Sequence, residues 1–148
     1  MIRRMITTVE ADEIIECDES PVSAVRHKKN STITVGANIV KEGRAGAFIS
    51  AGSSGAVLAA GQLIVGRLPG VKRPPLASMI PTAKGFSLFL DLGANVDAKA
   101  EWLCQFARMG SIYMEKVQHK ERPSVKLVNL GGEEEKGNAL TKEANTML

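Results

Sequence analysis

The feature that most constrains this fold is a pattern that occurs three times along the chain. A short apolar run ends in a turn of glycine and polar residues, and a helix-like stretch follows. Alternation of buried strands with helices favours a mostly parallel sheet with helices on both faces. We therefore expect an α/β fold whose three turns lie along one edge of the sheet. The runs cover residues 45–50, 86–92 and 125–130, and their turns cover 51–55, 93–95 and 131–138.

Further elements fit the same layered plan. Ser20 and Pro21 are typical of a helix start, and residues 32–42 have helical apolar spacing that Gly43 would end. Apolar and β-branched residues at 2–9 and 76–80 predict two more strands.

The composition excludes several classes of protein. The 148 residues suffice for one domain with a real core, and a net charge of +3 permits an acidic partner without requiring nucleic acid. We find no apolar run of membrane-spanning length and no signal peptide. Cys17 and Cys104 are far apart and His27 and His119 are scattered, so we expect reduced thiols and no zinc site. No nucleophile-and-base arrangement for a covalent acyl-enzyme is legible.

The glycine turns offer the chemistry of an anion site. Backbone N–H groups ahead of a helix, together with the positive end of its dipole, bind phosphate and other oxyanions. The spacing fits neither a P-loop nor a dinucleotide fingerprint, so simple α/β turns remain the alternative. Lys136 is the one obvious cation in these turns. The candidate phosphate-binding residues are Ser50, Gly52, Ser53, Gly55, Asn95, Gly131 and Asn138.

Two acidic groups near the turns each have two interpretations. The glutamates at 133–135 are a general base or metal cluster, or they are acids at a helix start; we favour the helix start for at least two of them. Asp91 either orients Lys99 or Lys136, or it caps the turn at Gly93.

The basic cluster at residues 26–29 is either a solvated helix face or a docking site for an acidic protein or phosphate group.

Six segments of the chain, in this order, carry a resemblance to a known family. Because the segments extend along most of the chain, the resemblance covers essentially all of it. They are DESPVSAVRHKKNS, SAGSSGA, VGRLPGVKRP, DLGANVDAK, ARMGSIY and NLGGEEEKGN, at residues 18–31, 50–56, 65–74, 91–99, 107–113 and 129–138. Together they resemble the bacterial phosphate acyltransferase family, PlsX.

This resemblance implies an enzyme that moves a fatty acyl group from the thioester of acyl carrier protein to inorganic phosphate. The acyl phosphate product feeds glycerol-3-phosphate acylation in phospholipid synthesis. The resemblance also implies a three-layer α/β/α sandwich like that of isocitrate dehydrogenases and phosphotransacetylases. It implies a cytoplasmic homodimer, peripheral at the inner face of the membrane, with no metal or organic cofactor. The family's proposed catalytic lysine falls on Lys136. Acyl carrier protein is acidic, and we expect it to dock on Arg26, Lys28 and Lys29.

The chain also departs from the family pattern. Family members begin with a strand and a Gly-Gly-Asp turn and continue well past the position of Leu148. We therefore expect residues 1–148 to be a partial domain that lacks an N-terminal strand-turn and a C-terminal part. Ser53 stands where the family usually has asparagine, and Gly132 where threonine or glutamate is usual. Two alternatives stay open: a truncated copy that does not catalyse, and a phosphotransacetylase-like acyltransferase that uses acyl-CoA.

Overall fold

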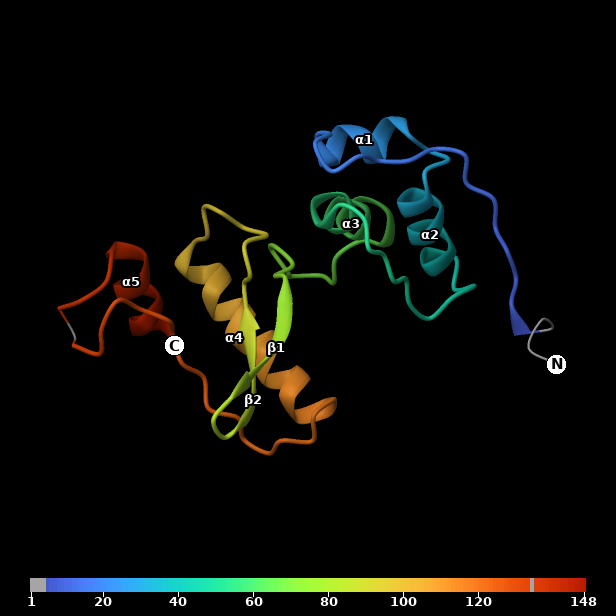
Figure 1. Ribbon diagram of the computed structural model, residues 1–148. Helices are drawn as coiled ribbons and strands as arrows, with labels where there is room; N and C mark the ends of the chain where they lie inside the picture. Colours follow the sequence, from blue (N-terminus) through green and yellow to red (C-terminus); the bar gives the residue numbers. More distant parts are fainter. Residues whose placement is uncertain (1–4, 134) are drawn as a thin grey trace. The chain divides into compact units, whose positions relative to one another are not determined.

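The structure is a computed structural model that describes residues 5–133 and 135–148. The chain folds as two compact units, one ending at Leu68 and the other formed by Pro69–Leu148. Figure 1 shows the helices and strands of both units.

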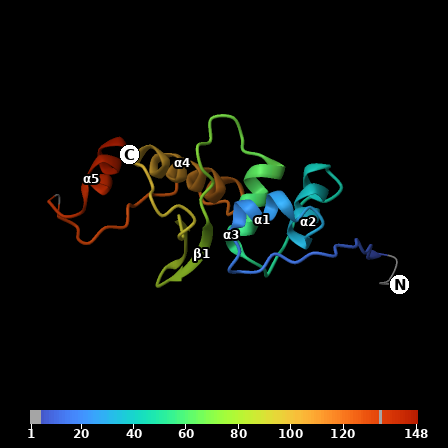
Figure 2. The ribbon, with the colours of Figure 1, turned by 90° about the horizontal axis from the view of Figure 1, so that it is seen from above.

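The first unit is a helical cluster with an alanine-rich core. α3 packs on α1 and on α2, and the small side chains between them let the helix backbones approach closely (Figures 1 and 2). The elements are α1 (Pro21–His27), α2 (Thr32–Lys41), α3 (Ser54–Ala60) and a π-helical turn that continues α3, η2 (Gly61–Val65). The buried core residues are Ile15, Ala24, Val25, Ile33, Ala37, Ala56, Ala59 and Ala60.

Serine caps and a glycine define the ends of α2 and α3. Ser31 Oγ accepts a hydrogen bond from the N–H of Thr34 at 3.3 Å and donates one to Thr34 Oγ1 at 2.8 Å. Ser53 Oγ accepts from the N–H of Ala56 at 3.3 Å. Gly43 follows α2 with a φ of 71°, a left-handed conformation that glycine adopts without strain. The helix starts and stops predicted for this unit are therefore confirmed to within a turn.

The second unit combines a β-hairpin with two helices. β1 and β2 are antiparallel, with Ala77 opposite Leu90 and Thr82 opposite Gly85. α4 lies along β2, and α5 packs on α4. Gly110 allows the close approach of α4 to the hairpin, because a Cβ at this position would lie 2.7 Å from Leu90 Cδ1. The elements are β1 (Ala77–Thr82), β2 (Gly85–Leu90), α4 (Ala100–Lys116) and α5 (Ala139–Met147).

The sheet differs from the predicted mostly parallel arrangement. The strands predicted at 76–80 and 86–92 correspond to β1 and β2, but the two form an antiparallel hairpin. Residues 6–9, 45–50 and 125–130 form no strand, and residues 2–4 lie outside the described part. An extended run becomes a strand only where a neighbour supplies ladder hydrogen bonds. Within the described residues the only sheet is two-stranded, so these runs have no such neighbour.

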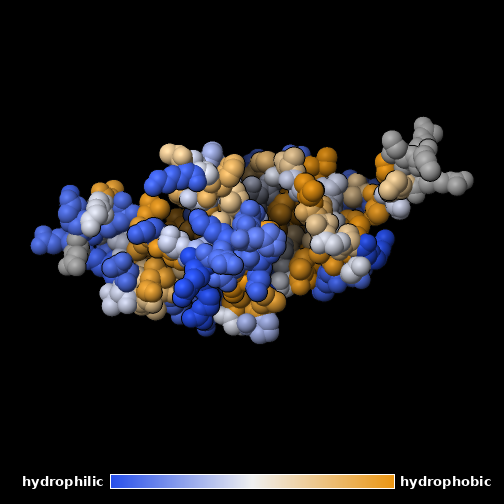
Figure 3. All heavy atoms as spheres, turned by 90° about the horizontal axis from the view of Figure 1, so that it is seen from below, coloured by the Kyte–Doolittle hydropathy of each residue, from blue (hydrophilic) through white to orange (hydrophobic). Residues whose placement is uncertain are grey.

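The unpaired apolar runs leave large apolar side chains on the surface. Ile49 is 94% exposed and Leu130 is 92% exposed. Figure 3 shows apolar side chains interspersed with hydrophilic ones on the face that it displays. Among the helices formed by residues 5–133 and 135–148, none combines the length and the apolar character needed to cross a bilayer.

Candidate functional site

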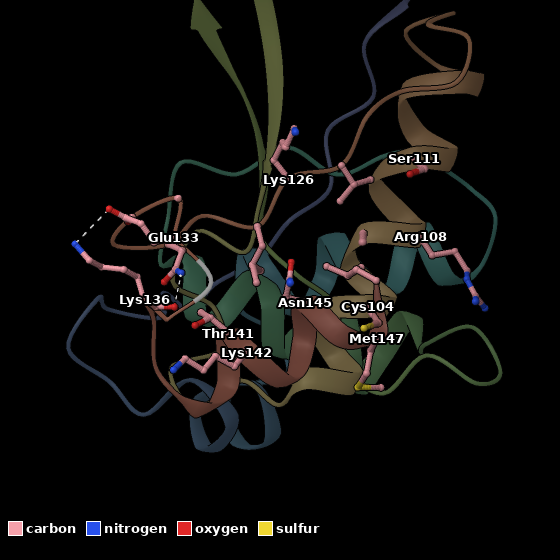
Figure 4. Close-up of a pocket in the computed structure, with 17 residues that line it drawn as sticks. Cys104, Arg108, Ser111, Lys126, Glu133, Lys136, Thr141, Lys142, Asn145 and Met147 are labelled. Carbon is pink, nitrogen blue, oxygen red and sulfur yellow. Dashed lines mark hydrogen bonds and ion pairs between the residues drawn. The ribbon is translucent and has the colours of Figure 1, made fainter.

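A hollow of about 840 Å³ lies in the second unit beside the turn that carries Lys136. α4, the loop at 125–136 and α5 form its walls (Figure 4). This volume falls in the range of roughly 300–1,000 Å³ that is usual for small-ligand sites. Polar and charged side chains dominate the lining, so the hollow suits a polar ligand. They belong to Arg108, Ser111, Lys126, Asn129, Glu133, Lys136, Thr141, Lys142 and Asn145.

Local hydrogen bonds fix the turn around Lys136. Its N–H donates to the carbonyl of Glu133 at 3.0 Å, and the Asn129 amide donates to the carbonyl of Lys136 at 3.1 Å. Gly137 follows with a φ of 99°, and a Cβ there would lie 2.4 Å from Thr141 Oγ1. Glycine is therefore required at this position by the backbone conformation and by the available space. The turn holds Lys136 at the rim of the hollow.

The side chain of Lys136 forms only a weak ion pair. Its Nζ lies 3.8 Å from Glu133 Oε1, and the two side chains are 56% and 67% exposed. Figure 4 shows Lys136 turned toward Glu133 and away from Cys104. An exposed pair of this kind contributes about 0–1 kcal/mol. Lys136 can therefore leave Glu133 for an anionic ligand at small cost.

Four cationic side chains line the hollow, those of Arg108, Lys126, Lys136 and Lys142, against one described acidic side chain, that of Glu133. In Figure 4 the four cations lie at separate points around the hollow. A cleft lined by one sign of charge concentrates ligands of the opposite sign, so the hollow favours an anion.

Sequence reasoning missed three of these cations, Arg108, Lys126 and Lys142. For Arg108 a signal was present, because Cys104, Arg108 and Ser111 follow the i, i+4, i+7 spacing of one helix face, and all three line the hollow. For Lys126 no such signal existed, since its neighbours were predicted to form a strand.

The helix-start interpretation of the glutamates is wrong for the two that the structure describes. α5 begins at Ala139, and its first turn contains no acidic residue. Glu133 and Glu135 precede it in the loop, and Glu134 lies outside the described residues. No group of histidine, cysteine, aspartate or glutamate side chains in the described part could hold a metal ion.

Gly131 and Asn138 contribute to the turn in different ways. Gly131 lines the hollow, and a Cβ there would lie 3.1 Å from Lys136 Cδ, so this glycine leaves room for the lysine side chain. Asn138 is the N-cap of α5, because its Oδ1 accepts from the N–H of Thr141 at 2.9 Å. Asn138 is not among the lining residues.

Asp91 caps the glycine turn after β2. Its Oδ1 accepts from the N–H of Leu76 at 2.6 Å, and its Oδ2 accepts from the N–H and the Nδ2 of Asn95 at 2.7 Å and 3.0 Å. Asn95 Nδ2 also donates to the carbonyl of Pro74 at 3.1 Å. The capping interpretation of Asp91 is therefore confirmed. Both amide hydrogens of Asn95 have acceptors within the protein, and Asn95 does not line the hollow.

The turn at 50–55 belongs to the first unit, whereas every lining residue of the hollow belongs to the second. Ser50 Oγ accepts from the N–H of Gly52 at 3.1 Å, and Ser53 is the buried cap of α3. Gly55 allows a close helix approach, because a Cβ there would lie 2.8 Å from Pro21 Cγ. These residues have local structural roles, and their binding of phosphate stays a prediction.

The basic cluster at residues 26–29 is not uniformly free. Lys28 donates to the carbonyl of Ile14 at 2.7 Å and forms an ion pair with Glu19. The hydrogen bond from Lys28, assisted by one from the N–H of Glu16, lowers the pKa of Glu19 below its usual value. Arg26 and Lys29 are exposed. A docking surface here would therefore rely on Arg26 and Lys29 more than on Lys28.

Comparison with known proteins gives a consistent result. Residues 2–148 match the family model described as fatty acid synthesis protein. The phosphate acyltransferase of Oceanobacillus iheyensis is 52% identical over 145 residues, which are 97% of this chain and 43% of that protein. The phosphate acyltransferase of Desulforamulus reducens is 51% identical over 144 residues, again 97% of this chain and 43% of that protein. That of Clostridium beijerinckii is 48% identical over 146 residues, 99% of this chain and 44% of that protein. The chain thus spans less than half the length of the curated relatives it matches.

Proposed function

This chain belongs to the fatty acid synthesis protein family, and from that premise we propose that the whole protein transfers a fatty acyl group from acyl carrier protein to inorganic phosphate. The observation that carries the proposal is Lys136, in a glycine-flanked turn at the rim of a hollow that three further cations line. The relatives of this chain bear the name phosphate acyltransferase, which supports acyl transfer with phosphate as the acceptor. Acyl carrier protein as the acyl donor is the more specific part of the proposal.

Phosphate binding would use the cations of the hollow. Inorganic phosphate is a dianion near neutral pH, and charge-assisted hydrogen bonds to lysine and arginine are among the stronger contacts in proteins. Lys136 would exchange its weak pair with Glu133, at 3.8 Å, for a phosphate oxygen. Glu133 would then repel the bound anion and help to set how readily it leaves.

The reaction would form one bond and break another. A phosphate oxygen attacks the carbonyl carbon of the thioester, and the carbonyl oxygen gains negative charge as the C–O bond forms. The C–S bond then breaks, and the carrier leaves as a thiolate that takes up the proton the phosphate has lost. Lys136 would balance the charge on the attacking phosphate and on the developing oxyanion, where a preorganised donor has most effect.

The remaining features of the whole protein belong to the same proposal. They are a three-layer α/β/α sandwich, a homodimer, and a cytoplasmic location with peripheral contact at the inner face of the membrane. The exposed Arg26 and Lys29 would receive acidic acyl carrier protein, and the turn at 50–55 would add backbone donors for phosphate.

Formation of acyl phosphate is the test of this proposal. The chain is incubated with long-chain acyl carrier protein and phosphate, and acyl phosphate is trapped and measured. We expect Lys136→Ala to reduce the rate by about a hundredfold or more. Lys116→Ala, which removes an exposed lysine from the last turn of α4, serves as the matched control and should leave the rate unchanged.

Other outcomes discriminate between the alternatives. Faster turnover with acyl-CoA than with acyl carrier protein would identify a phosphotransacetylase-like acyltransferase. No phosphate-dependent cleavage of either thioester by the unmodified chain would mean that residues 1–148 are a non-catalytic portion.

A further inference from the structure

A second hollow, of about 290 Å³, lies in the second unit between β2, α4 and the loop at 123–128. Its walls are mainly apolar, in contrast to the cation-lined hollow beside Lys136. β2 contributes Phe86 and Leu90, α4 contributes Phe106 and Met114, and the loop contributes Leu127. Phe106 and Met114 are buried, so α4 forms an apolar side of this hollow with well-packed side chains.

The two hollows share part of their lining. Ala107 and Ser111 of α4, with Val125, Lys126 and Leu127 of the loop, line both. Leu148 at the end of the chain lines both as well. Ala107, one turn before Ser111, has the smallest side chain of these shared residues, so α4 places no large group at this part of the shared wall. A polar space with several cations thus continues into an apolar one across a boundary that carries a hydroxyl and an ammonium group.

We propose that the second hollow holds the acyl chain of the substrate, with its reactive carbonyl end at the boundary near Ser111 and Lys126. The inference rests on the proposed function, because it names where the fatty part of that substrate lies. A ligand with an apolar tail and a polar or anionic head matches the two hollows, because the tail fits the apolar one and the head lies beside the cation-lined one. Phosphate alone would use only the cation-lined hollow. Apolar surface that leaves water drives such binding, and each buried methylene raises affinity by about fourfold.

Binding of a fluorescent long-chain fatty acid, below its micelle concentration, tests this inference without turnover or phosphate. The carboxylate stands in for the reactive end of the substrate. We expect saturable binding to the full chain. We also expect competing unlabelled fatty acids to gain affinity with length by about fourfold per methylene until the hollow is filled.

Two matched pairs of variants locate the binding. Ala107→Leu enlarges a side chain in the wall that the two hollows share and should weaken binding about tenfold, since overpacking in a filled space is unfavourable. Ala83→Leu makes the same change in the exposed hairpin turn and should have no effect. Val125→Asp introduces a carboxylate into the shared wall and should also weaken binding about tenfold. Val125 is 45% exposed in a loop, so folding should tolerate this change, and the control Val96→Asp replaces a valine that is 91% exposed.

The outcomes separate this inference from the proposed function. Fatty acid binding that Val125→Asp weakens and Val96→Asp does not would support the acyl site, even if acyl phosphate never forms. Absence of saturable binding, or equal binding by Val125→Asp and the unmodified chain, would overturn the acyl site, even if the chain proves to be an active acyltransferase. If Ala107→Leu fails to fold, the valine pair decides.

Discussion

Replacing Gly137 by alanine should loosen the turn that carries Lys136. Gly137 has a φ of 99°, and the new Cβ would lie 2.4 Å from Thr141 Oγ1 and 2.7 Å from both terminal atoms of the Asn129 amide. The two neighbours contacted are the ones that brace the turn. Asn129 donates to the carbonyl of Lys136 at 3.1 Å, and Thr141 Oγ1 donates to the carbonyl of Asn138 at 3.0 Å.

The magnitude of the effect follows from these contacts. A side-chain-bearing residue held in a sparsely populated backbone region costs about 1–3 kcal/mol. Displacing Asn129 and Thr141 removes two hydrogen bonds worth about 1 kcal/mol each. Because the β-hairpin and most of α4 are untouched, the loss should appear as local opening of residues 129–141 rather than as global unfolding. We expect about 2 kcal/mol or more of local destabilisation.

Amide hydrogen exchange at Lys136 and Thr141 measures this opening. The N–H of Lys136 is bonded to the Glu133 carbonyl and that of Thr141 to Asn138 Oδ1, so both report on the turn. Exchange at the two sites should become roughly thirtyfold faster in Gly137→Ala.

Gly132→Ala is the matched control in the same loop. A Cβ at Gly132 meets nothing within 4 Å, and its φ lies outside the left-handed region. This change should leave exchange unaltered or slightly slower, because alanine restricts the unfolded chain. Equal acceleration by both variants, or no acceleration by Gly137→Ala, would refute the assignment of a special role to Gly137.

Three further changes test the local structure. Ser31→Ala removes the buried cap of α2 and should lower the free energy of unfolding by about 1–2 kcal/mol. Ser20→Ala is the control and should leave this free energy unchanged, because Ser20 makes no side-chain hydrogen bond that caps α1. Urea denaturation of the two variants measures the difference. Asp91→Ala leaves several backbone N–H groups of its turn unpaired and should cost about 2 kcal/mol, while the exposed Asp97 serves as the control in the same assay. The pKa of Glu19 is lowered by its lysine partner, so its stabilising contribution is present above the unfolded-state pKa and is lost as pH falls through the folded-state pKa. The difference in urea midpoint between the unmodified chain and Glu19→Gln should therefore shrink on acidification, and a difference that is independent of pH would contradict this.

Local signals predicted the helices well, because caps and glycines act within a few residues. Ser20-Pro21, Gly43 and the spacing of residues 32–42 identified α1 and α2, and the turn residue Asn138 preceded α5 as expected. Asp91 was correctly seen as a candidate cap of the turn at Gly93.

The sheet was less predictable, because strand formation depends on neighbours distant in sequence. Residues 45–50 and 125–130 are apolar enough for buried strands, yet no described residue pairs with them. β1 and β2 were recognised as strands, but their short connection at Ala83 and Lys84 allows the antiparallel hairpin that the α/β pattern did not predict.

Only part of the candidate site could be predicted. Lys136 and Gly131 line the hollow, and their roles in catalysis and in phosphate binding stay predictions. Asn95 and Ser53 instead have structural bonding partners, which sequence cannot distinguish from ligand contacts. Arg108 was not predicted, because the candidate residues were sought in the glycine turns and Arg108 lies on a face of α4.

Phosphate titration of the unmodified chain and of Lys136→Ala, followed by phosphorus NMR, tests the central claim most directly. If the cation-lined hollow is an anion site centred on Lys136, the unmodified chain binds phosphate saturably. Loss of one charged contact should then weaken binding about tenfold or more, while Lys116→Ala binds as the unmodified chain does. Equal phosphate affinity in Lys136→Ala and the unmodified chain would contradict the account.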